Sequence, residues 1–206
     1  MELRPLPLPY LPLRWVYTRP LAALLVLCLL AWAGVRPAPA GAGDEPRFTP
    51  QKELVRPEGH REWIFIGATL GMSYSEDAPT HEPTFHNLYL KPAAYQEYKR
   101  TGRFPEKTII VMETLSAGSQ ASINRQGHFE DRPVGLEAAV KDSSRFPEGW
   151  AYFNFTQGDG LAATARAFPK QLCWDCHHQH GATDNVFTQF YPVLRRASGG
   201  DGSHRR

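Results

Sequence analysis

The chain has 206 residues, of which 42% are hydrophobic and 12% aromatic, which is enough to form the core of one globular domain. Its 23 basic and 21 acidic residues leave a net charge of +2 with the histidines neutral. This near balance gives no indication of a nucleic acid or an anionic surface as a partner. The function must therefore be sought in local motifs.

The first forty residues have the organisation of an export signal. Arg4, Arg14 and Arg19 precede an apolar run over 21–35, and the small-residue site Ala38-Pro-Ala40 follows. This order predicts a secretory signal peptide over 1–40 and a periplasmic location. The apolar run is shorter than the roughly 20 residues of a spanning helix, although an uncleaved N-terminal anchor stays open as an alternative. Residues 41–55 are polar with Pro and Gly and are expected to form a linker.

Hydrophobic patterning then predicts a folded domain over 56–197. Apolar and β-forming runs indicate strands over 63–66, 85–90, 108–113 and 150–155, whereas 134–140 fits either a strand or a helix. Helices are expected over 92–98, over the alanine-rich 161–168, and from a cap at 183–184 through 194. The Gly-, Ser- and Arg-rich tail over 198–206 is expected to be disordered.

These elements predict an α+β fold. We expect a mainly antiparallel sheet with a few helices packed on it, the C-terminal helical end carrying the sequence Cys173-Trp-Asp-Cys176-His177.

That sequence is the C-x-x-C-H signature of covalent haem attachment. Its two thiols can form thioether bonds with the two vinyl groups of a haem, and the next residue, His177, can then supply its imidazole to the iron. One motif predicts one haem c per chain. Outside the predicted signal, Cys173 and Cys176 are the only cysteines.

Other uses of these cysteines are less well supported. A disulfide over this spacing would close a very small loop and stabilise little. A thioredoxin-like redox pair would need a βαβ pattern, which the sequence lacks. A zinc site would need two further ligands at metal-binding spacing, for which His178 and His180 are awkwardly placed.

The ordered motifs around the haem signature resemble those of the cytochrome P-460 family, which includes the cytochromes c′-beta. The residues that carry the resemblance are Arg61–Trp63, Tyr89–Pro92, Tyr95, Lys99–Phe104, Thr108–Glu113, Gly135–Glu137, Val140–Ser143, Arg145–Phe146, Trp150–Phe153, Cys173–His177, Asp184, Val186–Thr188 and Phe190–Leu194. The resemblance implies a homodimer with five-coordinate haem iron and His177 as the proximal ligand. Some members of the family oxidise hydroxylamine and carry a lysine–haem cross-link, whereas the c′-beta members lack the cross-link and bind nitric oxide.

Met112 stands where the resemblance places the cross-linking lysine. A thioether cannot form that bond, and Lys107, five residues away, is expected on the opposite face of the strand. We therefore expect no cross-link and expect Met112 to face the haem, although core filling is an alternative role.

The resemblance places Phe85 and His86 at the distal side of the iron, and Glu137 is a further candidate for a distal acid. Phe85 would cap the iron, His86 would donate a hydrogen bond to a bound ligand, and Glu137 would move protons. For each residue an ordinary role stays open: core packing for Phe85, and a solvated side chain for His86 and Glu137.

Three functions follow as hypotheses. The first is an exported haem protein that binds a small nitrogen-oxide ligand such as nitric oxide at an open distal site. The second is an oxidoreductase that acts on hydroxylamine or nitric oxide and passes electrons to a partner cytochrome. The third is a simple electron-transfer cytochrome with a sixth protein ligand on the iron.

Overall fold

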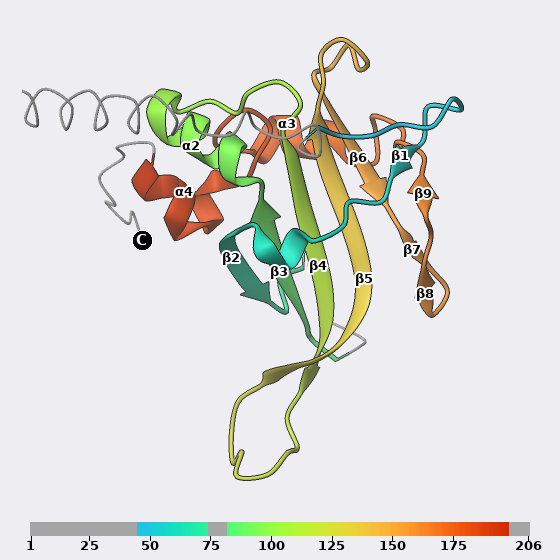
Figure 1. The fold of residues 1–206 in the computed structure, drawn as a ribbon. Helices are drawn as coiled ribbons and strands as arrows, with labels where there is room; N and C mark the ends of the chain where they lie inside the picture. The colour runs from blue at the N-terminus through green and yellow to red at the C-terminus, as the bar shows by residue number, and fades with distance from the viewer. Residues whose placement is uncertain (1–44, 74–81, 198–206) are drawn as a thin grey trace, which may run out of the picture. The chain divides into compact units, whose positions relative to one another are not determined.

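A computed structural model describes residues 45–73 and 82–197 (Figure 1). The predicted signal peptide, the beginning of the predicted linker and the C-terminal tail lie outside these ranges. In the described part of the chain, no helix has both the length and the apolar character required to span a membrane.

A five-stranded antiparallel sheet forms the centre of the fold, and its strands follow one another in chain order. They are β2 (Ile64–Leu70), β3 (Thr84–Leu90), β4 (Ile109–Gly118), β5 (Phe129–Lys141) and β6 (Trp150–Asn154). Within the described residues, the sheet is accompanied by the helices α2 (Pro92–Thr101), α3 (Trp174–His180) and α4 (Pro192–Ala197). The predicted α+β fold is confirmed, and α3 carries most of the haem-attachment motif.

The strand register aligns side chains in rows across the sheet. Leu88, Met112 and Glu137 are direct partners on neighbouring strands, so their side chains point to the same face. The next row on that face contains Leu90, Ile110, Ala139 and Tyr152. This face packs against Tyr98 of α2, Trp174 of α3 and Leu194 of α4 in one hydrophobic core. Val186 and Phe187, from the segment after α3, belong to the same core.

The opposite face of the sheet carries a second core. Alternate residues of β4, β5 and β6 point to this side, among them Ile109, Val111, Ala138 and Phe153. Leu54, which is fully buried, packs with them, and β1 (Leu54–Val55) pairs with β9 (Thr164–Ala165). The end of the segment expected to be a linker is thus part of the domain packing, because its few apolar residues fill a place on this face.

The described part of the chain also contains several short elements. These are the 3-10 helices η1 (His60–Glu62) and η2 (Thr188–Phe190) and the hairpin strands β7 (Thr156–Gln157) and β8 (Gly160–Leu161).

The predicted helix after β3 is confirmed. It begins at Pro92, which suits the first helical turn because its missing N–H has no partner to lose. It ends at Gly102, whose φ of 71° closes the last turn in the left-handed region. The ambiguous range 134–140 is a strand within β5.

The helix predicted over 161–168 is wrong. Residues 160–161 pair with 156–157, and 164–165 pair with 54–55. The alanines favour a helix locally, but backbone pairing with β1 and burial of Ala165 in the second core decide the conformation.

The last predicted helix is also wrong at its beginning. Asp184 and Asn185 both have positive φ angles, 50° and 60°, and the flanking residues Thr183 and Val186 bridge to each other. This is the pattern of a type I′ turn, which Asp and Asn tolerate better than most residues. The helical structure resumes only at η2 and then at α4, which begins with Pro192.

Candidate haem site

Helix α3 gathers the three residues of the haem-attachment motif. Cys173 precedes the first helical turn, and its carbonyl accepts a hydrogen bond from the backbone N–H of His177 at 3.0 Å. Residues three and four apart on a helix share one face, so Cys176 and His177 lie on the side of Cys173. Both thiols are free.

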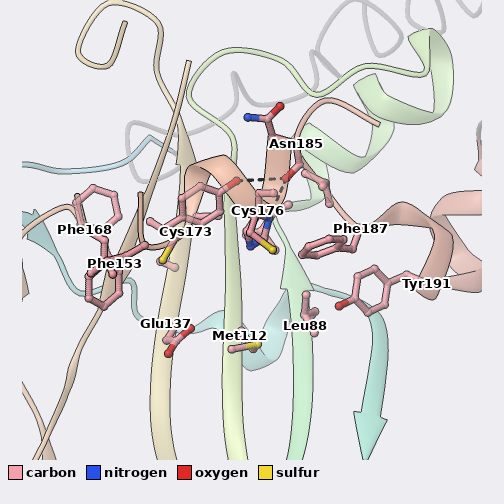
Figure 2. Close-up of a pocket in the computed structure, with 17 residues that line it drawn as sticks. Leu88, Met112, Glu137, Phe153, Phe168, Cys173, Cys176, Asn185, Phe187 and Tyr191 are labelled. Carbon is pink, nitrogen blue, oxygen red and sulfur yellow. Dashed lines mark hydrogen bonds between the residues drawn. The ribbon is translucent and has the colours of Figure 1, made fainter. Parts of the chain in front are cut away.

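The three side chains line one cavity between α3 and the sheet (Figure 2). Leu88, Met112 and Glu137 lie on the sheet side of the cavity, with both cysteine sulfurs above them in the figure. The remaining lining residues are mainly apolar: Ile110, Ala138, Ala139, Tyr152, Phe153, Phe168, Leu172, Asn185, Val186, Phe187 and Tyr191.

His177 is held by hydrogen bonding and by aromatic contacts. Its Nδ1 lies 3.0 Å from the carbonyl oxygen of Asn185. Because a carbonyl only accepts, Nδ1 must carry the proton, which leaves the Nε2 lone pair free for a metal. The imidazole ring lies between the rings of Tyr152 and Phe187, at centroid distances of 4.2 and 4.5 Å. Burial lowers the pKa of His177, although the Asn185 carbonyl opposes this, and the ring is therefore held in the neutral form that ligates iron.

The Cys173 thiol does not have the electrostatics of a reactive redox cysteine. Burial is the main cause that raises the pKa of Cys173, and the neighbouring Glu137 and Cys176 raise it further. Reactive redox cysteines have lowered pKa values, so a thioredoxin-like role finds no support.

The arrangement of the side chains does not support a zinc site either. Within residues 45–73 and 82–197, no group of three or more His, Cys, Asp or Glu side chains is arranged to hold a metal ion. A haem iron needs fewer ligands from the protein than a zinc ion does, because the porphyrin supplies four nitrogens and the protein need supply only one imidazole.

Glu137 lines the cavity beside Met112, its direct partner on β4. Burial raises the pKa of this carboxyl, since the apolar surroundings disfavour the charged form. Met112 is partly buried and packs against the first core, so it combines the cavity-lining and core-filling roles.

The structure does not bring Phe85 and His86 into the cavity. Phe85 is three residues from Leu88 on β3, and an odd separation places it on the opposite face of the sheet. His86 shares the face of Leu88 but lies one row further along, beside Thr114, and contacts Thr84 Oγ1 at 3.4 Å. Burial lowers the pKa of His86. The predicted distal role of Phe85 conflicts with this strand register.

The cavity is chemically suited to a haem. It offers two free thiols and a neutral imidazole on one wall, and aliphatic and aromatic side chains over most of the remainder. An apolar macrocycle with two vinyl groups and an iron atom matches this set of groups.

Sequence reasoning missed several residues that shape the site. Tyr152 and Phe187 flank His177, and the alternation of β6 could have indicated Tyr152 once the cavity face was known. The Asn185 carbonyl is a backbone group, so no pattern of side chains could have indicated it. Tyr191 approaches closely because Gly67 has no side chain: a Cβ there would lie 2.8 Å from the Tyr191 ring.

Comparisons with known proteins agree with this geometry. No curated protein matches the chain significantly. The family model for cytochrome P460 matches residues 57–188, which include β2 to β6, α3 and all three residues of the attachment motif. The matched region is more than half of the chain, and the family implies a haem cofactor. The chain therefore belongs to the cytochrome P460 family of haem proteins.

Proposed function

We propose that this chain is an exported c-type cytochrome with one haem, an open distal iron site for a small nitrogen-oxide ligand such as nitric oxide, and no lysine–haem cross-link. Cys173 and Cys176 form the two thioether bonds, and His177 is the proximal ligand. The haem supplies an iron centre that binds diatomic ligands. The observation that carries the proposal is the arrangement of both free thiols and the neutral imidazole on one wall of an apolar cavity.

Lysine positions support the absence of a cross-link. Among the described residues, no lysine lines the cavity. Lys107 precedes β4, and its Nζ lies 2.6 Å from Asp142 Oδ2 and 3.2 Å from Ser144 Oγ. Lys141 is bound to Asp184 at 2.6 Å. Met112 occupies the position expected for the cross-linking lysine and has no amine.

The wall opposite His177 supports an open distal site. Among the described lining residues, His177 is the one histidine, so no second imidazole is in place to ligate the iron. Met112 is the one lining side chain of the sheet with a sulfur donor, and its coordination would turn the protein into an electron carrier.

An oxidoreductase acting on hydroxylamine or nitric oxide is the second candidate, and Glu137 favours it. A carboxyl with a raised pKa inside the cavity can exchange protons with a ligand during redox chemistry. Transfer of electrons to a partner cytochrome would complete such a reaction.

Spectra of the ferrous holoprotein with and without nitric oxide test the first candidate. A high-spin spectrum that changes on addition of stoichiometric nitric oxide supports an open site. A low-spin spectrum that does not change with the ligand contradicts it. If Met112→Leu then converts this spectrum to one that responds to nitric oxide, Met112 is the sixth ligand.

Turnover of hydroxylamine with an added electron acceptor would favour the oxidoreductase, provided that Glu137→Gln slows this turnover.

Export and assembly belong to the same proposal. The periplasmic location rests on residues 1–40, and the homodimer rests on the family resemblance. Fractionation of cells and the solution mass of the holoprotein test the two parts separately.

A further inference from the structure

We propose that Asp184 is a positioning residue for the proximal ligand: it holds the turn over 183–186 in the conformation that presents the Asn185 carbonyl to His177. The inference rests on the proposed function, since it assumes that His177 ligates the haem iron.

The turn has a conformation that needs support. Asp184 and Asn185 are consecutive residues other than glycine with φ angles of 50° and 60°. Such residues visit the left-handed region at an energetic cost, and surrounding contacts must offset it. Two backbone hydrogen bonds between Thr183 and Val186, of 2.9 and 3.3 Å, close the turn but do not fix its position against α3.

The Asp184 carboxylate anchors the turn to the sheet, in addition to the contact of the Asn185 side chain with His178 Nδ1 on α3 at 3.3 Å. Its Oδ2 accepts a hydrogen bond from Lys141 Nζ at 2.6 Å, and its Oδ1 accepts one from Trp150 Nε1 at 3.3 Å. Lys141 and Trp150 are direct partners across β5 and β6, so both donors belong to the rigid sheet. Lys141 also donates to the Phe104 carbonyl at 2.9 Å. The carboxylate therefore fastens the turn to the edge of the central sheet.

In this position the turn places the backbone carbonyl of Asn185 within hydrogen-bonding distance of two side-chain donors. The Asn185 oxygen receives His177 Nδ1 at 3.0 Å and the Tyr152 hydroxyl at 3.2 Å, as the dashed lines in Figure 2 show. The Tyr152 hydroxyl is the donor in its contact, because a carbonyl oxygen can only accept. The two donors share one oxygen, so the Tyr152 hydrogen bond weakens the acceptor available to His177.

A stronger hydrogen bond at Nδ1 makes the imidazole a better electron donor through Nε2. A more basic axial ligand favours ferric over ferrous iron and lowers the reduction potential. Loss of the Asp184 anchor should weaken the His177 hydrogen bond, whereas loss of the Tyr152 hydroxyl should strengthen it. The two changes should therefore shift the potential in opposite directions.

The test compares three variants of the full-length holoprotein: Asp184→Ala, Asp184→Asn and Tyr152→Phe. Reduction potentials and the iron–histidine stretching frequency of the ferrous state are measured for each. We expect Asp184→Ala to lower the iron–histidine stretching frequency. It should also raise the reduction potential by up to about 59 mV, which corresponds to a tenfold change in the one-electron redox equilibrium. Tyr152→Phe should raise the frequency and lower the potential. Asp184→Asn, which keeps the Trp150 acceptor and tolerates positive φ, should lie nearer the wild type.

Asp175→Asn is the charge control, because it removes a carboxylate from α3 whose partner is Lys170. If it raises the potential as much as Asp184→Ala, and the stretching frequency is constant in both, the effect is one of charge alone and the proposal is overturned. If Asp184→Ala does not fold, Tyr152→Phe decides: an unchanged or higher potential overturns the proposal. If every variant carries covalent haem and has the iron–histidine stretching frequency of the wild type, only the positioning role of Asp184 is overturned. If the wild type carries no covalent haem, the proposed function is overturned.

Discussion

At the scale of single residues, Glu137 shows how the sheet introduces a carboxyl into an apolar cavity. Among the described lining residues it is the one carboxylate, and its strand register beside Met112 determines its direction. Burial raises its pKa. The protonated form is thereby favoured beyond the usual range of a glutamate.

This shift predicts a loss of stability as the pH rises. A carboxyl with a raised pKa in the folded state binds its proton more tightly when folded than when unfolded. Between the ordinary value of 4.5 and the raised value, the free energy of unfolding should fall by up to about 1.4 kcal/mol per pH unit. Glu137→Gln should remove this term, so the variant should gain stability relative to the wild type across that window. Urea denaturation of both holoproteins as a function of pH measures the difference.

The exposed Glu62 provides the matched control, because Glu62→Gln also removes one carboxylate. A stability difference between wild type and Glu137→Gln that does not grow with pH, or that reverses, would show that burial does not hold Glu137 in its neutral form.

At the scale of elements, the site depends on a close approach between the end of α3 and the turn that follows it. Gly181 has a φ of −68°, so its backbone conformation suits any residue. What excludes a side chain is space: an added Cβ would lie 2.6 Å from the His177 carbonyl oxygen and 2.9 Å from backbone atoms of residues 185 and 186. Backbone cannot give way as a flexible side chain does.

Gly181→Ala should therefore destabilise the protein, by about 1–3 kcal/mol as for other overpacked positions. Gly160→Ala is the control, since its Cβ would meet only the Gln157 carbonyl oxygen, at an ordinary 3.8 Å. Chemical denaturation of the two variants should show a clear loss for the first and little change for the second. Equal losses would mean that the contact between α3 and the turn is not tight.

The sequence was informative about elements whose packing follows from a local pattern. Local patterns predicted the strand around Met112 and the helix over 92–98, and both are confirmed because local signals and tertiary structure agree there. The range 161–168 could not be predicted in this way, since its pairing partner lies more than one hundred residues upstream at 54–55. The same holds for the site. A short motif indicated Cys173 and His177, whereas the distal assignment of Phe85 came from the family resemblance, and no local signal in the sequence fixed the register that decides which face Phe85 occupies.

At the scale of the whole domain, the two faces of the sheet carry separate cores. One core includes the cavity and the helices, and the other is closed by the segment around Leu54 and by β9. The sheet that lines the cavity on one face is therefore supported on its other face by Leu54, which precedes the folded domain expected over 56–197, and by β9.

Leu54→Ala tests this support. Removal of a fully buried leucine should cost about 2–5 kcal/mol, because the cavity it leaves is lined by residues that cannot all move inward. Leu161→Ala, at a position that is 43% exposed, should change stability by no more than about 0.5 kcal/mol. Thermal or urea denaturation distinguishes the two. A small effect of Leu54→Ala would mean that residues before β2 contribute little to the domain.

Intact-protein mass spectrometry under denaturing conditions tests the central claim most directly. Protein purified from the periplasm of a host able to mature c-type cytochromes should carry the mass of one haem after unfolding. Proteolysis should place this mass on the peptide that contains Cys173 and Cys176, with no bond to a lysine peptide, and Cys173→Ser/Cys176→Ser should lose it. Unfolded wild-type protein without haem, or haem joined to a further peptide, would contradict the account.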